Sequence, residues 1–303
     1  ILLALGLPMW AELPDSSQLK IPGIGGHTDE SPVTTSLKDA VTEVPLLDGF
    51  SPRDFLPLDA LFYRSGPGFR LFPGVFAAEL QSYCLHAGAY GPTKGDGYLY
   101  APLKGPQAGP IRSILDNSAR HPDIQQDVIQ TLIWAILARA NPEDLEKEER
   151  QAAGKLLSRQ ELSALSRAAQ PPLTEDAFDQ LYGRIPAAVR ELLKAENALR
   201  ERFASGSVSY EELEEIAVKT GQHEPGPGSR EVPAGRWSYD PAGFFIRFFP
   251  SSYSQTRVEV SVPRPCTLSR DAQGRLVRVD DRSGHVLDCS YGSASLKVPG
   301  DSG

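Results

Sequence analysis

A nearly continuous apolar run at residues 128–138 predicts a helix that is buried on almost every side. The predicted helix covers Asp123–Ala140, which contains no glycine or proline. Pro122 is expected in its first turn, where a missing N–H costs nothing. Asn141-Pro142 should end the helix, because the residue before a proline avoids the α region. Gln130 interrupts the apolar run, and a carboxamide buried there must find hydrogen-bond partners.

Shorter apolar runs predict β-strands ahead of this helix. The clearest is residues 74–85, which ends at Tyr83-Cys84-Leu85 before glycines release the chain into a loop. Runs at 36–48 and 55–71 are broken by proline and glycine and are expected to form short strands, with a turn at 64–70. These segments indicate a β-rich N-terminal domain around the buried helix.

The middle of the chain has the pattern of amphipathic helices. Asn141 is a capping residue followed by acidic residues, which favours a helix start. Ser158 and Ser209 each open a capping box, in which a glutamate follows the serine by three residues. Apolar residues recur at helical spacing through 187–203. The segment 141–221 is therefore expected to be helical, with its charged residues on a solvated face.

Strand signals return near the end of the chain. Residues 243–250 are rich in phenylalanine, and residues 256–263 alternate, with their valines on one face. Two more strand signals, at 271–280 and 281–291, flank an Asp-Arg-Ser-Gly turn and predict a hairpin. This last region predicts an antiparallel β domain.

Together these patterns predict the α+β class: a β-rich N-terminal domain with a buried helix, a helical middle segment and a C-terminal antiparallel β domain. The expected parts are a signal-peptide remnant at 1–11, a disordered leader at 12–35, an α+β domain at 36–140, a helical segment at 141–221, a linker at 222–235 and a β domain at 236–303.

The first residues suggest export. Ile1–Ala11 is apolar and resembles the central part of a secretory signal, with cleavage expected after Ala11. The run is too short to span a bilayer, and the polar, Pro- and Gly-rich residues 12–35 resemble an unstructured leader. The alternative is a buried N-terminal strand or helix. Export favours a secreted or cell-surface location, with the periplasm also open, and no membrane insertion of the mature chain.

Composition limits the partners. The 303 residues are 40% hydrophobic and 23% charged, as in an ordinary globular protein, and the net charge is −8. An acidic chain is a poor partner for nucleic acid or an anionic membrane. No Cys-x-x-Cys pair or His-x-x-x-His spacing is present, so neither a metal site nor a cofactor is expected. The sequence does not indicate an oligomeric state.

The stretch 82–140 carries several short motifs in order. They are Tyr83-Cys84-Leu85, a Gly/Pro-rich crossing, an Ile-x-x-Ile-Leu segment from Ile111, and Ile129-Gln130-x-x-Ile133-Trp134. This order resembles the bacterial thioester domains of surface adhesins. The resemblance implies an internal thioester between Cys84 and Gln130, with Trp134 as the motif tryptophan. The sequence departs from the family pattern at Ile129, where the family usually has threonine.

Thioester formation would demand a particular environment. The Cys84 thiolate attacks the carboxamide carbon of Gln130 and ammonia leaves, which requires near-attack geometry and exclusion of water. Tyr83 and Trp134 suit a dry site, and His86 is a candidate proton shuttle because its ordinary pKa lies near neutrality. In the alternative, Cys84 is a small core residue, Gln130 is a satisfied core amide and His86 belongs to a loop.

The other two of the three cysteines, Cys266 and Cys289, lie in the C-terminal β region. In an exported protein they are expected to form a disulfide, which leaves Cys84 unpaired. In a cytosolic protein all three would instead be reduced. Residues 271–292 also resemble a single YD-type (Rhs-like) repeat unit of bacterial surface proteins.

Three classes of function stay open at this point. The first is an adhesive module, not an enzyme, that bonds an amine- or hydroxyl-bearing surface ligand or protein through the Cys84–Gln130 thioester. The second is a structural or interaction protein of the cell surface with the same fold and no thioester. The third is a hydrolase or transferase with Cys84 as nucleophile and His86 or His121 as base.

Overall fold

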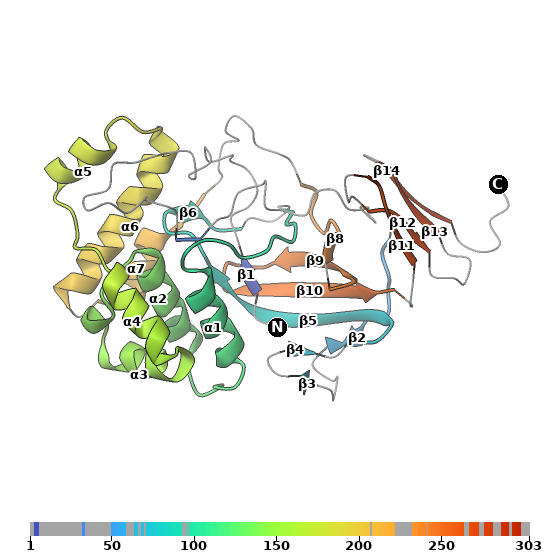
Figure 1. Cartoon of the computed structure of the whole chain (residues 1–303), viewed down its shortest axis with the longest axis horizontal. Helices are drawn as coiled ribbons and strands as arrows, with labels where there is room; N and C mark the ends of the chain where they lie inside the picture. Colours follow the sequence, from blue (N-terminus) through green and yellow to red (C-terminus); the bar gives the residue numbers. More distant parts are fainter. Residues whose placement is uncertain are drawn as a thin grey trace.

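The computed structural model describes most of the chain between residues 50 and 297. The described residues are 3–5, 32–33, 50–58, 64–65, 68–69, 71–92, 95, 97–206, 208–221, 232–240, 242–263, 267–272, 276–280, 286–290 and 293–297. Within them the protein is α+β, as predicted. Helices gather at one end of a mixed sheet, and a second small sheet lies at the other end (Figure 1).

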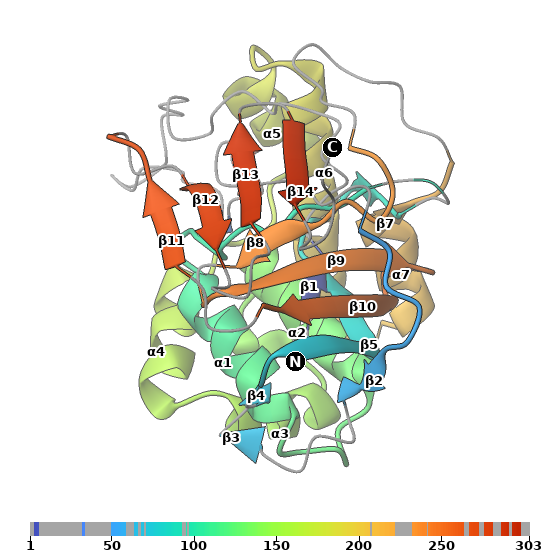
Figure 2. The ribbon, with the colours of Figure 1, turned by 90° about the vertical axis from the view of Figure 1, so that its right-hand side faces the viewer.

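The main sheet is built around β5 (Gly74–Cys84), which confirms the strand predicted at 74–85. The sheet has six strands in the order β1-β5-β10-β9-β8, with β2 also paired to β5. The outer members β1 (Leu3–Leu5) and β2 (Leu56–Pro57) run parallel to β5, whereas β10 (Gln255–Val262), β9 (Phe244–Pro250) and β8 (Ser238–Asp240) follow each other antiparallel (Figure 2). The strands expected at 243–250 and 256–263 are thus confirmed.

One face of this sheet forms an apolar core because its residues alternate. Val258 and Val260 of β10 lie opposite Ala78 and Phe76 of β5, and all four contribute to a cluster that includes Phe248. The other face carries a buried ion pair, in which Arg247 Nε donates to Glu259 Oε2 at 2.7 Å. The valine alternation that predicted the strand therefore also identified its core face.

Seven α-helices are described, and four of them pack against α2. Their bounds are α1 Ala108–Ser118, α2 Gln126–Leu137, α3 Lys147–Leu156, α4 Arg159–Ala168, α5 Glu175–Tyr182, α6 Ala187–Ser205 and α7 Tyr210–Ala217. Helix α2 packs against β5, α1, α3, α6 and α7. Every residue from Val128 to Leu137 is buried, which confirms the predicted buried helix.

The observed helix ends agree in part with those predicted from the sequence. The capping boxes at Ser158 and Ser209 are both formed, at the starts of α4 and α7. The start predicted for α2 at Pro122–Asp123 was wrong, because Gln125 has extended backbone (ψ 151°) and the helix begins at Gln126. Asn141 does cap a helical turn, but Pro142–Asp144 is a short 3₁₀ helix, separate from α3.

Short strands connect the regions around these elements. β3 (Arg64–Ser65) and β4 (Gly68–Phe69) form a small hairpin at the predicted turn. β6 (Ala89–Tyr90) pairs in parallel with β7 (Val218–Lys219), and so ties the chain after Cys84 to the end of α7. Gly88 has φ +75° and a Cβ there would lie 2.7 Å from the Cβ of Ala195, so this position requires glycine.

The second sheet has four strands in the order β11-β12-β13-β14: Thr267–Arg270, Leu276–Asp280, Val286–Ser290 and Ser293–Lys297. The pairing of β12 with β13 confirms the predicted hairpin. The expected boundary near residue 235 is corrected by the main sheet, because β8, β9 and β10 pair onward to β5 rather than with β11–β14. Alternation shows which face of a strand is buried but not which strand lies beside it.

Several predictions remain untested by this fold. Residues Leu3–Leu5 pair with Ser82–Cys84, which matches the alternative of an N-terminal strand, and cleavage after Ala11 stays a prediction. The strand at 36–48, almost all of the leader at 12–35 and most of the linker at 222–235 lie outside the described residues. Cys266 and the side chain of Cys289 also lie outside them, so the predicted disulfide stays a prediction.

Candidate functional site

Cys84 and Gln130 meet where the end of β5 contacts the first half of α2. The Cys84 amide donates to Gln130 Oε1 at 2.8 Å, and Gln130 Nε2 donates to the Cys84 carbonyl oxygen at 3.0 Å. Gln130 is 1% exposed and Cys84 is 9% exposed. The polar residue that interrupts the apolar helix is therefore satisfied by the backbone of the cysteine that the motif resemblance pairs with it.

The contact is held by polar residues on either side of it. Gln126, one turn before Gln130, donates through Nε2 to the carbonyl oxygens of Ser82 at 3.1 Å and Ser254 at 2.7 Å. Ser82 Oγ donates in turn to the Tyr253 carbonyl oxygen at 3.0 Å. These bonds fasten α2, the end of β5 and the β9–β10 turn to one another.

The Cys84 thiol is protonated and hydrogen-bonded to a backbone carbonyl. Its Sγ donates to the His86 carbonyl oxygen at 3.0 Å, and burial raises the pKa of the thiol. Burial also lowers the pKa of His86 to about 4, so its ring is neutral at pH 7. A cysteine nucleophile of an enzyme needs the opposite environment, one that lowers the thiol pKa.

Trp134 lies one turn beyond Gln130 and is completely buried. Its Nε1 has no hydrogen-bond acceptor in the described part of the chain, yet the indole lies near enough to Cys84 to favour its thiolate form. A buried donor without an acceptor costs stability, roughly 1–3 kcal/mol. Trp134 therefore places an unused N–H beside the sulfur.

Two tyrosines and a glutamate complete the site. The ring of Tyr210, the first residue of α7, stacks on Trp134 with centroids 5.4 Å apart, and Tyr253 tilts against the same indole at 6.4 Å. The hydroxyls of Tyr210 and Tyr253 are 2.8 Å apart, and Tyr253 donates to Glu214 Oε1. Sequence analysis missed all three residues. The capping box located Tyr210 at a helix start but gave no sign of what its ring contacts.

Tyr83 is buried beside this group. Its hydroxyl donates to Gln81 Oε1 at 3.2 Å, and burial raises its pKa, with Tyr210 acting in the same direction. The structure thus brings Cys84, His86, Gln130 and Trp134 together. Tyr83 is buried next to them.

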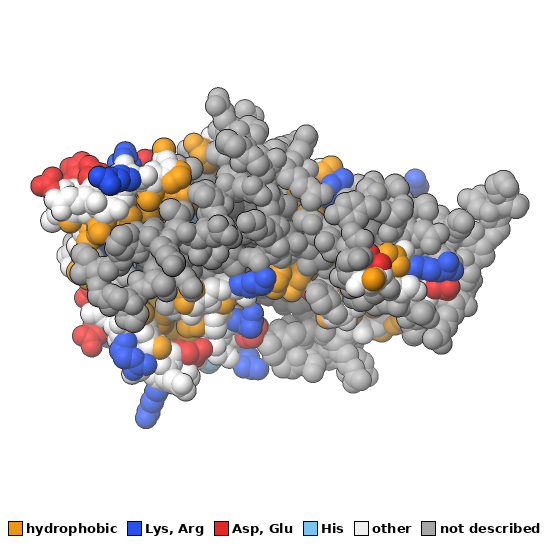
Figure 3. Space-filling model, turned by 45° about the horizontal axis from the view of Figure 1, so that its top comes forward, with side chains coloured by type: hydrophobic (Ala, Val, Ile, Leu, Met, Phe, Trp, Pro, Cys, Tyr) orange, Lys and Arg blue, Asp and Glu red, His pale blue; other side chains and the backbone are white. Residues whose placement is uncertain are grey.

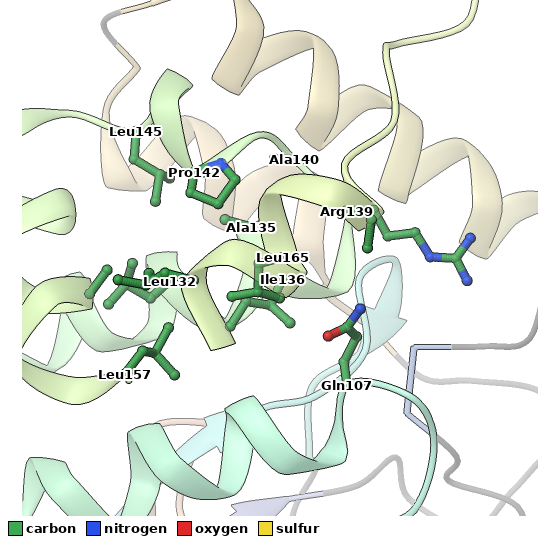
Figure 4. A pocket seen from close by; sticks show the side chains of 13 residues that line it. Gln107, Leu132, Ala135, Ile136, Arg139, Ala140, Pro142, Leu145, Leu157 and Leu165 are labelled. Atoms are coloured by element: carbon green, nitrogen blue, oxygen red, sulfur yellow. The ribbon is translucent and has the colours of Figure 1, made fainter. Parts of the chain in front are cut away.

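Two cavities flank α2. One, of about 20 Å³, lies between α2, α3 and α4 and is lined by apolar side chains such as Leu132, Ile136 and Leu165 (Figure 4). It has room for about one water molecule and few polar groups to hold one. The other, of about 110 Å³, is bounded by Tyr210 and Asp127 and by four further acidic residues, Asp144 and Glu146 ahead of α3 and Glu148 and Glu149 in its first turn. Only this second cavity adjoins the residues around Cys84.

Comparison with known proteins assigns the chain to no family. No family model matches the chain, and neither a curated protein nor a solved structure matches it. Within the described residues no group of acidic, histidine and cysteine side chains is arranged to hold a metal ion. None of the described helices combines the length and apolar character needed to cross a bilayer.

Proposed function

We propose that Cys84 and Gln130 form an internal thioester and that the chain is a secreted or cell-surface module that attaches covalently to an amine- or hydroxyl-bearing ligand. The observation that carries this proposal is the reciprocal pair of hydrogen bonds between the Gln130 carboxamide and the Cys84 backbone. It holds the acyl donor against the thiol-bearing residue in a site from which water is excluded. Amide bonds are poor acyl donors, so such positioning is the main contribution that a protein can make.

The bond-forming step balances without a cofactor. The Cys84 sulfur turns from the His86 carbonyl oxygen to the Gln130 carboxamide carbon, a rotation about its Cα–Cβ bond. The C–S bond forms, the C–N bond breaks, and the thiol proton leaves with the nitrogen as ammonia. Trp134 Nε1 supports the step because it can donate to sulfur as negative charge develops there.

A non-covalent surface protein with the same fold is the second candidate. It is favoured by the same hydrogen bonds, which satisfy both Cys84 and Gln130 without any chemistry, as in an ordinary core. The third class, a cysteine-nucleophile enzyme, is disfavoured by the raised pKa of Cys84, because an enzyme needs the thiolate in every turnover whereas an internal thioester forms only once. The similarity of residues 271–292 to one YD-type repeat unit fits either surface role.

Intact mass of the unreduced protein separates these candidates. A thioester lowers the mass by one ammonia relative to the sequence, and this deficit should be absent from Cys84→Ala and should disappear on treatment with methylamine. A Cys266–Cys289 disulfide would remove only two hydrogens, so the two bonds are distinguishable. A wild-type mass with no ammonia deficit would leave the non-covalent role as the better account.

A further inference from the structure

We propose that Tyr210, Tyr253 and Glu214 form a proton relay that takes up the proton of an incoming ammonium group when an amine opens the Cys84–Gln130 bond. This inference rests on the proposed thioester. It assigns a role to three residues that no sequence motif indicates, and it names the group in which the proton ends, the Glu214 carboxylate.

The reaction creates the need for such a group. A primary amine is protonated at neutral pH and must lose one proton before its nitrogen can attack. The attack then forms a C–N bond at the Gln130 carbonyl carbon and breaks the C–S bond. The second proton goes from nitrogen to the Cys84 sulfur, which restores the thiol. A proton placed on His86 would leave a positive charge on a buried ring, whereas a proton placed on a carboxylate removes a charge.

The geometry of the relay is continuous. Tyr210 and Tyr253 hydroxyls are 2.8 Å apart, and Tyr253 already donates to Glu214. When Tyr210 accepts the ammonium proton, its own proton passes to Tyr253, and the proton of Tyr253 passes to the Glu214 carboxylate. Each oxygen gains one proton and loses one, apart from Glu214, which keeps the proton. Glu214 is only half-buried, so the proton ends near solvent.

The inner end of the relay packs on Trp134, the residue that separates it from the reactive pair. Tyr210 stacks on Trp134, and Trp134 lies one turn after Gln130 on α2. Burial raises the pKa of Tyr210 to about 12; hydrogen bonding to Tyr253 opposes this shift, and the carboxylates of Glu214 and Asp127 add to it. The phenols therefore stay neutral at physiological pH and transfer protons rather than store them.

The cavity beside Tyr210 gives an ammonium group a route to this end. Its volume is about 110 Å³, and its acidic lining includes Asp127 from α2 and Glu146 and Glu149 from the α3 region. Burial raises the pKa of Glu149, and the neighbouring carboxylates add to this effect. Closely spaced carboxylates of this kind attract a cation. The charged residues of the helical end are visible in Figure 3.

A purely structural role for the same contacts makes a different prediction. The Tyr210–Tyr253 bond also docks α7 onto the β9–β10 turn, so its loss would loosen the site in general. A loosened site would alter the reaction with every nucleophile. Loss of a proton relay would instead slow only nucleophiles that arrive protonated.

The test measures the rate at which the ammonia-deficient protein is opened, by intact mass, for Tyr253→Phe, Glu214→Gln and wild type. With methylamine at neutral pH we expect each variant to be about 100-fold slower, the size typical of general acid–base catalysis. The difference should shrink as the pH rises and free amine becomes abundant. With hydroxylamine, which is unprotonated at neutral pH, the rates should be equal. Glu215→Gln, an exposed neighbour on α7, is the matched control and should behave as wild type.

The outcomes separate the relay from the thioester itself. A wild-type protein without the ammonia deficit overturns both, because the relay then has no bond to serve. A deficit together with unchanged methylamine rates in Tyr253→Phe and Glu214→Gln overturns the relay alone. Equal slowing with methylamine and hydroxylamine also overturns it and assigns the contacts a structural role. If Tyr253→Phe does not fold, the rates of Glu214→Gln alone distinguish the proton relay from a structural role.

Discussion

Replacing Gln130 with glutamate changes one nitrogen for one oxygen and removes one hydrogen bond. With its carboxamide intact, Gln130 donates through Nε2 to the Cys84 carbonyl oxygen at 3.0 Å. An ionised carboxylate has no donor for that carbonyl and places a negative charge against it in a site that is 1% exposed. The bond from the Cys84 amide to the other oxygen survives. The change therefore isolates the polar pairing from the shape of the side chain.

The expected magnitude follows from the burial. A buried charge without a counter-charge costs about 3–5 kcal/mol when nothing rearranges around it. We expect Gln130→Glu to lose about this much free energy of unfolding at neutral pH. The comparison is made in a Cys84→Ala background, so that loss of the thioester does not contribute.

The pKa of the introduced carboxyl determines how the loss of stability changes with pH. Burial and the facing carbonyl should raise the pKa of the new carboxyl above the value of about 4.3 that a glutamate has in an unfolded chain. The folded state then holds the proton more tightly than the unfolded state. The loss of stability should be small below the unfolded pKa, because the protonated group can donate to the Cys84 carbonyl. It should grow as the pH rises to the folded pKa and then stay constant.

Urea unfolding followed by circular dichroism, at neutral and at mildly acidic pH, measures both quantities. Gln125→Glu is the matched control, because Gln125 is exposed at the start of α2, where the helix dipole tolerates a negative charge. A loss below about 1 kcal/mol, as at an ordinary surface site, would refute the reasoning about the buried pair. So would a loss that does not change with pH.

Three further outcomes are expected. Glu259→Gln should lower the free energy of unfolding by about 3 kcal/mol, because it leaves the buried Arg247 without its charge partner. Urea unfolding measures this loss, with the exposed Glu215→Gln as the control. Gly88→Ala should lower the melting temperature, because it combines a positive φ with a contact of 2.7 Å to the Ala195 Cβ, and an unchanged value would contradict the fold there. After treatment with methylamine, which would open the proposed thioester, Cys84 should react with iodoacetamide far more slowly in the folded than in the urea-unfolded protein, since burial raises its pKa.

The elements that the sequence predicted are those whose signals are local. Helix α2 and strands β5, β9 and β10 each show their own periodicity, and the boxes at Ser158 and Ser209 need only four consecutive residues. The error at the start of α2 is also local. A proline is accepted in a first helical turn and in the turn before it, so Pro122 did not decide between them.

Strand neighbours and the outer part of the site were not predictable in the same way. Val258 and Val260 indicated a core face, but nothing in their alternation indicates that β10 pairs with β5, more than 170 residues earlier. Tyr210 and Tyr253 are 43 positions apart and lie on a helix and a turn. Their contact depends on the docking of α7, which the pairing of β6 with β7 fixes.

The pairing of β10 with β5 makes the C-terminal strands part of the site, although the motifs lie within residues 82–140. The Ser82 amide donates to the Ser254 carbonyl oxygen at 3.0 Å, and Gln126 donates to the same oxygen at 2.7 Å. Ser254 belongs to the turn between β9 and β10, so that turn sets the spacing between β5 and α2. The Cys84–Gln130 contact, which lies one turn further along α2, depends on the same spacing. Residues 36–140 therefore hold Cys84 and Gln130 but not the contacts that keep the two residues in place.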